Sequence, residues 1–383
     1  MTAQLGIAPG SVVLVVIDLA GGGTQQVVAG LARALRDTRT HVTIITNQTS
    51  DGRWGDLLAT VDVIEIPGEL QVNQSRGSPT MLNNFRWLLH GVYIIRRRVK
   101  SAPPGTPVLA FLPGTNVLTS LALLGFRAAL VLCERNDMSR QPLSPPLRVA
   151  RRLLYRRATV ATANRPEDVP RLSALVHPAP VQLVLNPQPS NLDRARPSAS
   201  RRILAAGRLT AHKRHRDILI AFSALADEFP EWTLRLLGDG PERSALETLV
   251  QELDLADRVE ISGWLPDITK ELCQGAMLVH ASEYEGVSNA VVEAMTTGLP
   301  VIASEASAPW PFARANDAET FGFSVFPTGD VDTLTARLRQ LMTAGDFRDR
   351  IGEKAHDAVE QFTADPLTAW LPVMKAALRR SAT

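Results

Sequence analysis

The stretch "SEYEGVSNAVVEAMTTGLPVIAS", residues 282–304, has the pattern of a loop, a short helix and an apolar strand in succession. Glu285 is followed by a glycine and by helix-capping residue types, so we expect it on the loop, whereas Glu293 falls within the first turns of the helix. The helix is expected to end at Gly298 and Pro300, before a strand at residues 301–303. One carboxylate therefore approaches a ligand from the end of a strand, and the other approaches it from a helix.

The same alternation of short apolar runs and helix-period segments extends over almost the whole chain. It predicts an α/β fold with two Rossmann-like, doubly wound domains, each a parallel sheet covered by helices on both faces. Strands are expected at residues 12–17, 42–46, 108–112, 129–133 and 181–185, and then at residues 202–206, 233–237, 259–262, 277–280 and 299–303. Helices are expected near residues 333–341, 347–362 and 367–380.

A polar, proline-bearing segment, "NPQPSNLDRARPSAS", separates the two series of strands. We therefore expect an N-terminal domain at residues 1–190 and a C-terminal domain at residues 191–365, with a last helix at 366–383 that crosses back to the first domain. Ligands bind at the carboxyl ends of the strands in such folds, so the site is expected in a cleft between the two sheets.

Composition narrows the class of protein. The chain has 383 residues, 45% apolar content and a net charge of +2, which indicates a soluble globular protein with two cores. Its two cysteines indicate neither a disulfide framework nor a thiolate metal site. No signal peptide is evident, and the longest apolar tract is too short for a bilayer span, so we expect a cytoplasmic protein.

The small net charge is the sum of a basic first half and an acidic second half of the chain. Residues 1–190 carry 20 Lys+Arg and 11 Asp+Glu, a net charge of +9, whereas residues 191–383 carry 21 and 28, a net charge of −7. A basic first half favours an anionic partner such as a nucleic acid, a membrane surface or a phosphorylated acceptor.

Cationic and glycine-bearing turns follow the strands of the second half. In "GRLTAHK", Arg208 and Lys213 can converge on a diphosphate, Arg through its fork and Lys as a point charge. In "SGW", Gly263 allows a ligand to come close to the backbone. Trp264 either flanks a nucleobase or packs against other side chains of the protein. The turn "LLGDGPER" is a weak signal, because such turns serve many βα units.

The helix that starts near Ser288 offers free N–H groups and the positive end of its dipole to an anion. Glu293 could accept hydrogen bonds from both hydroxyls of a ribose, with Glu285 toward the other end of that ligand. In the first half, Gly21, Gly22 and Gly23 follow the first strand without the pattern of an NAD site. That glycine loop can admit a donor or acceptor phosphate close to its N–H groups.

These motifs, in this order and at these intervals, resemble the retaining nucleotide-sugar glycosyltransferases of family four, which have the two-domain GT-B fold. Glu285 and Glu293 match that family's E-x7-E motif. The opening "GGGTQQVVAGLARAL" and "LCERNDMSRQPL" also resemble members that extend lipid-linked bacterial glycans. The resemblance therefore spans nearly the whole chain.

The resemblance implies a hexosyl- or N-acetylhexosaminyltransferase that uses a UDP-sugar, with no cofactor and no metal. It implies that Arg208 and Lys213 bind the diphosphate, Glu293 the ribose and Glu285 the transferred sugar. The donor-side set would be completed by Gly263, Trp264, Gly286, Val287, Ser288 and Asn289. Glu134, Arg135 and Asn136 stand where many relatives have a histidine, so they are placed on the acceptor side and no general base can be named.

The segment "FRWLLHGVYIIRRRVK" in the basic half predicts an interfacial helix. Its expected membrane contacts are Trp87, Arg96, Arg97, Arg98 and Lys100, and "RVARRLLYRR" adds a second basic cluster. A packed helix with a solvated face explains each segment equally well. With the resemblance, these segments favour peripheral association with the inner face of an anionic membrane and a lipid-linked glycan acceptor.

Three alternatives remain open at this point. One is a soluble glycosyltransferase that acts on a small sugar or a natural product, and another is a sugar-nucleotide epimerase of the same fold. The third, a basic nucleic-acid-binding protein, is disfavoured because no nucleic-acid-binding motif is present.

Asp330 and Asp332 are expected to cap a helix near Thr333 rather than bind a metal. His212 and His215 are too few for a metal site.

Overall fold

The computed structural model describes residues 10–19, 22–47, 54–67, 81–187, 192–265, 267–308 and 322–382. The chain divides into unit 1, Met1–Pro187 with Ala364–Thr383, and unit 2, Gln188–Thr363. The sequence analysis placed these boundaries at residues 190 and 365. Each unit has its own core and is described by itself.

Unit 1 is built on a seven-stranded parallel sheet with the order β3-β2-β1-β4-β5-β6-β7. Its strands are β1 (Ser11–Val15), β2 (His41–Thr46), β3 (Asp62–Glu65), β4 (Pro107–Phe111), β5 (Ala129–Cys133), β6 (Val160–Ala163) and β7 (Val181–Leu183). Its helices are α1 (Gly23–Asp37), α2 (Gly55–Leu58), α3 (Met81–Ser101), α4 (Pro113–Ala122), α5 (Pro145–Leu154), α6 (Val169–Val176) and α14 (Pro366–Ala382). A short strand, β8 (Asn186–Pro187), pairs with β15 (Thr363–Ala364).

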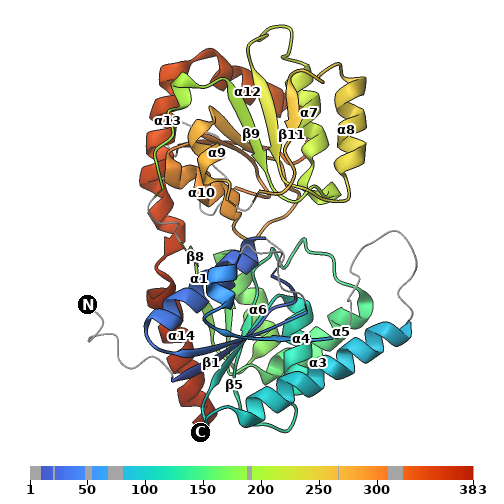
Figure 1. The fold of residues 1–383 in the computed structure, drawn as a ribbon, viewed down its shortest axis with the longest axis vertical. Coiled ribbons are helices and arrows are strands. Elements are labelled where there is room, and N and C mark those ends of the chain that lie inside the picture. Colours follow the sequence, from blue (N-terminus) through green and yellow to red (C-terminus); the bar gives the residue numbers. More distant parts are fainter. Residues whose placement is uncertain are drawn as a thin grey trace. The chain divides into compact units, whose positions relative to one another are not determined.

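Alternate residues of the strands face two separate apolar layers of unit 1, as the two-residue period of a strand requires. Val12 and Leu14 of β1 point into the layer that includes Trp370 and Val373 of α14. Their neighbours in β1 point into the opposite layer, which includes Ile95 of α3. The last helix of the chain, red in Figure 1, therefore belongs to the core of unit 1.

Unit 2 is built on a six-stranded parallel sheet with the order β11-β10-β9-β12-β13-β14. Its strands are β9 (Arg202–Ala206), β10 (Thr233–Leu237), β11 (Val259–Ile261), β12 (Met277–His280), β13 (Val301–Ser304) and β14 (Phe323–Phe326). Its helices are α7 (His215–Ser223), α8 (Arg243–Glu252), α9 (Thr269–Gln274), α10 (Asn289–Thr297), α12 (Val331–Thr343) and α13 (Gly345–Ala358).

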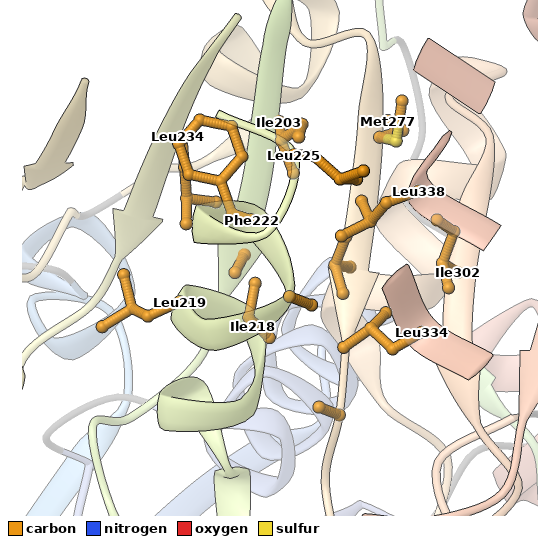
Figure 2. Packing of buried hydrophobic residues seen from close by; sticks show 14 of the residues in the cluster. Ile203, Ile218, Leu219, Phe222, Leu225, Leu234, Met277, Ile302, Leu334 and Leu338 are labelled. Atoms are coloured by element: carbon orange, nitrogen blue, oxygen red, sulfur yellow. The ribbon is translucent and has the colours of Figure 1, made fainter. Parts of the chain in front are cut away.

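One face of the unit 2 sheet is covered by α7, α8 and α12. Figure 2 shows Phe222 of α7 and Leu338 of α12 packed with Ile203 of β9 and Ile302 of β13. The capping role predicted for Asp330 is confirmed, because its carboxylate accepts a hydrogen bond of 2.9 Å from the backbone N–H of Thr333 at the start of α12.

The strand order fixes where each sheet reverses its direction of winding. In unit 2 the reversal lies between β9 and β12, and in unit 1 it lies between β1 and β4. The chain leaves the two strands at such a point toward opposite faces, and this opens a crevice at their carboxyl ends. The turns after β9 and β12 are therefore the positions in unit 2 where a ligand is expected.

The glycines of the turn "LLGDGPER" serve backbone packing. A Cβ atom at Gly238 would lie 2.0 Å from the carbonyl oxygen of Gly207, and one at Gly240 would lie 2.4 Å from that of Leu209. Hydrogen bonds join the same turns, from the N–H of Gly207 to the carbonyl of Leu237 and from the N–H of Leu209 to the carbonyl of Asp239. The turn after β10 thereby supports the turn after β9.

We predict that Gly238→Ala lowers the free energy of unfolding of unit 2 by about 1–3 kcal/mol, because the added methyl group displaces the Gly207 carbonyl. Denaturant unfolding of the full chain measures the change. Ser244→Ala, on the exposed face of the adjoining α8, is the control and should leave stability within about 0.5 kcal/mol. Equal stability of Gly238→Ala and the wild-type protein would show that this contact is not needed.

Candidate functional site

Two oppositely charged side chains meet at the reversal point of the unit 2 sheet. Lys213 belongs to the turn between β9 and α7, and Glu285 belongs to the loop between β12 and α10. The ammonium of Lys213 forms an ion pair with Oε1 of Glu285, and the two side chains are only 16% and 15% exposed. The topology therefore brings together two residues that are 72 positions apart in the chain.

The Lys213 ammonium keeps Glu285 ionised. Burial by itself would raise the pKa of this carboxyl group, but the positive charge of Lys213 and a hydrogen bond from His280 outweigh burial and hold the pKa well below its usual range. Oε1 of Glu285 lies 3.3 Å from Nε2 of His280 and accepts a hydrogen bond of 3.1 Å from Ser282. The carboxylate is thus held in a defined orientation.

Three further contacts join the same two turns. The N–H of Glu283 donates to the carbonyl of His212 at 2.8 Å, and the guanidinium of Arg214 pairs with the Glu283 carboxylate at 2.8 Å. The rings of His212 and Tyr284 are stacked, with centroids 4.7 Å apart and an angle of 13° between their planes. The position of Glu285 relative to Lys213 therefore does not depend on their ion pair alone.

Buried histidines lie beneath the pair. Burial lowers the pKa of His280, which is enclosed at the end of β12. Burial, together with the nearby His280, Lys213 and His212, also lowers the pKa of His215, the first residue of α7, to about 3. Both rings are therefore neutral near pH 7, so the positive charge on this side of the site comes from lysine and arginine.

Arg208 supplies a cation that is open to solvent. It follows Gly207 at the end of β9, its side chain is exposed, and in the described part of the chain its guanidinium has no hydrogen bond or ion pair. After β11, two strands away from β9, Gly263 has φ +76° and forms an isolated bridge with Gly238, and the adjacent Trp264 is exposed. Arg208 is thus available to a ligand.

The second carboxylate lies on α10. Ser288 occupies the N-cap position with extended backbone angles and makes no side-chain cap hydrogen bond. Gly286, Val287 and Asn289 beside it are partly exposed, whereas Glu293, one turn into α10, is 7% exposed. The start of α10 therefore presents backbone N–H groups at the same end of the sheet as Lys213.

The reversal point of unit 1 carries the glycine loop. Gly22 is the N-cap of α1 and Gly23 is its first residue, while Gly21 lies outside the described residues. The side chain of Gln25 donates a hydrogen bond of 2.8 Å to Asp18, just after β1. The glycines thus stand at the start of a helix that has no acidic residue in its first turn.

Glu134 and Arg135, which the sequence analysis placed on the acceptor side, are both buried in unit 1. Glu134 accepts a hydrogen bond from Tyr155, and burial raises its pKa to about 7. Arg135 donates to the carbonyl of Val184 at 2.8 Å and to the side chain of Asn186. Asn136 is partly exposed.

The expected membrane contacts on α3 are partly wrong. Trp87 is 7% exposed and donates to the side chain of Asn47 at 2.5 Å. Arg96 donates to the carbonyls of Ala122 and Leu124, and Arg98 donates to Thr43. Trp87 and Arg98 thereby attach α3 to β2 and the residue after it, and Arg96 attaches α3 to the end of α4. Arg97 and Lys100, by contrast, are exposed.

The sequence analysis missed several residues of the site. His280, Arg214, Ser282 and Glu283 were not proposed as site residues. Their signal is position, since His280 ends β12 and the other three belong to the two turns that flank the reversal point. In the described part of the chain, no group of three or more His, Cys, Asp or Glu side chains is arranged to hold a metal ion.

Comparisons with known proteins identify the second unit. Residues 193–358 match the family model described as "Glycosyl transferases group 1". The lipopolysaccharide core biosynthesis glycosyltransferase LpsE of Rhizobium meliloti is 28% identical over 222 residues, which cover 56% of this chain and 63% of LpsE. LpsD of the same organism is 32% identical over 39% of this chain and 41% of its own length. The matched parts thus span less than two thirds of these relatives.

Among solved structures, Anabaena HepE in complex with UDP and glucose superimposes with a TM-score of 0.76 at 17% identity and covers 94% of this chain and 97% of HepE. At that identity the likeness shows the fold alone, which is GT-B. The resemblance to the family-four glycosyltransferases is confirmed, and residues 193–358 form a group 1 glycosyltransferase domain.

The neutral His215 predicts a pH dependence of stability. An unfolded histidine binds a proton below about pH 6.5, whereas the folded His215 binds one only near pH 3, so between these values the unfolded state binds more protons and stability falls as the pH falls. We expect His215→Leu to remove about 2 kcal/mol of the loss in unfolding free energy between pH 7.5 and 5. Denaturant unfolding at the two pH values measures this difference.

The control for this experiment is the exposed His90, for which His90→Leu should leave the pH dependence of unfolding unchanged. His215 lacks a hydrogen-bond partner for its Nδ1 atom, so leucine leaves no new polar group unsatisfied. A pH dependence that is the same in His215→Leu and the wild-type protein would show that His215 is not the source.

Proposed function

We propose that the chain is a retaining glycosyltransferase that transfers a sugar from a nucleoside diphosphate donor, UDP-linked, to a lipid-linked saccharide. The observation that carries this proposal is the Lys213–Glu285 pair at the reversal point of unit 2, with the solvent-exposed Arg208 beside it. Together with the start of α10, this arrangement fits a ligand with a diphosphate at its centre and hydroxyl groups at both ends.

In the proposed binding mode each group has one task. Arg208 binds the diphosphate through its guanidinium fork, and the N–H groups at the start of α10 contribute the favourable end of a helix dipole. Glu293 accepts hydrogen bonds from the ribose hydroxyls, and the exposed Trp264 flanks the nucleobase beside Gly263. Glu285 accepts hydrogen bonds from hydroxyls of the transferred sugar.

The reaction breaks the bond between the anomeric carbon and the diphosphate oxygen and forms a bond from the same carbon to an acceptor oxygen, on the same face of the sugar. The proton of the acceptor hydroxyl passes to the departing diphosphate, so the products are the glycosylated acceptor and a nucleoside diphosphate. Negative charge grows on the leaving group in the transition state. Lys213 and Arg208 stabilise that charge electrostatically, with no metal ion.

The acceptor is proposed from the charge of unit 1 and from the names of LpsE and LpsD, which belong to lipopolysaccharide core biosynthesis. Residues 81–157 contain 13 Lys+Arg and only two acidic residues, Glu134 and Asp137. Glu134 is buried against Tyr155, and Asp137 pairs with Arg165 at 2.5 Å. The exposed charge of this segment is therefore almost purely positive, which suits an anionic lipid surface.

Two helices present that charge beside apolar side chains. Within residues 86–101 of α3, the exposed side chains are Arg86, Leu89, His90, Tyr93, Arg97, Lys100 and Ser101. No residue of α5 is buried, and it exposes 60% of Val149 and 68% of Leu153 among arginines. Apolar groups enter the lipid headgroup region while the arginines remain at the phosphates. Each arginine contributes about 1 kcal/mol to the free energy of membrane binding. Among the described helices, none is long and apolar enough to cross a bilayer.

The two carboxylates predict opposite kinetic effects. Glu293→Ala should weaken binding of UDP by about 10- to 150-fold, because it removes charge-assisted hydrogen bonds to the ribose. Glu285→Ala should lower kcat by about 100-fold or more and leave UDP binding within a few-fold of the wild-type value. Calorimetric titration with UDP and transfer assays with radiolabelled UDP-sugars and extracted lipid measure both, and the reverse pattern would show that the roles are misassigned.

Membrane association is tested by flotation with vesicles of phosphatidylcholine and phosphatidylglycerol. The wild-type chain should float at low salt and be released at high salt, because screening weakens the attraction of arginine to lipid phosphates. The double variant Val149→Ser, Leu153→Ser should lose most of this binding. Leu183→Ser, which alters an exposed leucine on β7, is the matched control and should float normally. Absence of wild-type binding at low salt would reject the membrane-bound acceptor.

A further inference from the structure

A second candidate binding site lies in unit 1 at the amino-terminal edge of its sheet. A cavity of about 300 Å³ opens between the segment that enters β5, the turn after α5 and the last turn of α14. Its polar wall is formed by Arg127, Arg156, Arg157, Thr159, Arg380 and Ser381. The glycine loop lies at the carboxyl-terminal edge of the same sheet, so this cavity is separate from it.

Three of the arginines in the wall, Arg127, Arg156 and Arg157, are not neutralised by acidic side chains in the described part of the chain. No Asp or Glu lines the cavity. Like charges that line one cavity repel each other. A bound anion would relieve that repulsion.

Main-chain carbonyl groups hold two of the guanidinium groups in place. Nη2 of Arg157 donates to the carbonyls of Leu123 and Phe126, each at 3.1 Å, and Nη2 of Arg380 donates to the carbonyl of Pro178 at 3.2 Å. A carbonyl is a dipole, so it orients a guanidinium without cancelling its charge. The donors that remain on Arg157 are thus positioned before a ligand arrives, which lowers the entropic cost of binding.

We propose that this cavity binds a multiply charged phosphate, either a phosphate monoester or a diphosphate. Planar guanidinium groups bind phosphate oxygens through paired hydrogen bonds, and several of them together match a charge of two or more better than a single charge. The volume lies at the lower end of the range of about 300–1,000 Å³ that is typical of small-molecule sites. The proposal does not depend on the donor site in unit 2.

The phosphate has two possible sources, which are a soluble phosphorylated compound and a lipid headgroup. Arg156 belongs to the 3-10 turn at Tyr155–Arg157, which directly follows α5 with its exposed Val149 and Leu153. A headgroup in the cavity would place its acyl chains near that apolar face, whereas a soluble compound would make no use of it. The two sources therefore predict different partners for the same arginines.

The first arm of the experiment measures thermal unfolding of the full chain in inorganic pyrophosphate against sodium chloride of equal ionic strength. Pyrophosphate should raise the Tm of the wild-type chain, and the double variant Arg127→Gln, Arg156→Gln should lose that rise and bind pyrophosphate at least about tenfold more weakly. Without pyrophosphate the double variant should unfold at the same Tm or a higher one, because the repulsion is reduced. If Arg127 and Arg156 had only a structural role, their substitution would lower the Tm instead.

Three controls separate the cavity from the other proposed sites. Arg171→Gln, an exposed arginine of α6 that does not line the cavity, should keep the rise in Tm. Arg208→Gln, in the donor site, should also keep the rise in Tm with pyrophosphate. Adding Arg127→Gln and Arg156→Gln to this variant should abolish the rise. The cavity variant should still bind UDP, so a failure of this proposal and a failure of the proposed donor site give different results.

The second arm compares vesicles of phosphatidylcholine that contain either phosphatidic acid, a phosphate monoester, or phosphatidylglycerol, a diester, at matched net charge. A preference for phosphatidic acid that is lost in Arg127→Gln, Arg156→Gln identifies a headgroup as the source. A pyrophosphate effect without that preference identifies a soluble compound. If neither pyrophosphate binding nor the preference depends on Arg127 and Arg156, the proposal is overturned.

Discussion

The candidate site depends on one contact, the ion pair between Lys213 and Glu285 at the carboxyl ends of two adjacent parallel strands. The pair exists because β9 and β12 are neighbours at the reversal point of the sheet although long stretches of chain separate them. A main-chain hydrogen bond from Glu283 to His212 fixes the separation of the two turns. The charges therefore meet in a geometry that is set by the fold rather than by two flexible side chains.

The same contact determines how charge is distributed around it. Lys213 is neutralised by Glu285, and burial keeps His215 and His280 uncharged. The cation left without a partner in the described part of these two turns is Arg208, and it is exposed. A ligand with negative charge would be attracted to Arg208 and to the start of α10, while the paired Glu285 remains available to uncharged hydroxyl groups. The pair thus separates an anion-binding region from a region suited to a sugar.

Patterns along the sequence predicted several strands to the residue, such as β5, β9, β10 and β12. They missed β3, β6 and β14, which are four residues each and have the sequences DVIE, VATA and FSVF. Such short segments become strands because neighbours supply hydrogen-bond partners on an existing sheet, and that information is not local. The position of Arg208, Lys213 and Glu285 at the carboxyl ends of the strands could be predicted because they follow the well-predicted strands β9 and β12.

The errors in α3 and around β5 have a different physical cause. The aromatic and basic composition of α3 suggested a membrane face, but position along a helix decides which side chains are exposed. Trp87, Ile95 and Arg98 recur at helical spacing and face the core, whereas Tyr93, Arg97 and Lys100 face solvent. For Glu134 and Arg135 no periodicity was available, since both lie in the turn after a buried strand. Their burial depends on Tyr155 and Asn186, which are distant in sequence.

Because several arginines are bound within unit 1, the net charge of the first half overstates the positive charge that a partner can reach. Arg98, Arg135 and Arg165 contribute to its net charge of +9, yet they are bound to Thr43, Asn186 and Asp137 inside unit 1. Part of the positive charge that a partner can reach lies on the outer faces of α3 and α5 and in the cavity at the amino-terminal edge of the sheet. A uniform charge would attract any polyanion equally, whereas charge grouped in such places selects partners by shape. An extended duplex matches neither a 300 Å³ cavity nor an arginine-flanked pair of apolar side chains, and a lipid surface with phosphate headgroups matches both.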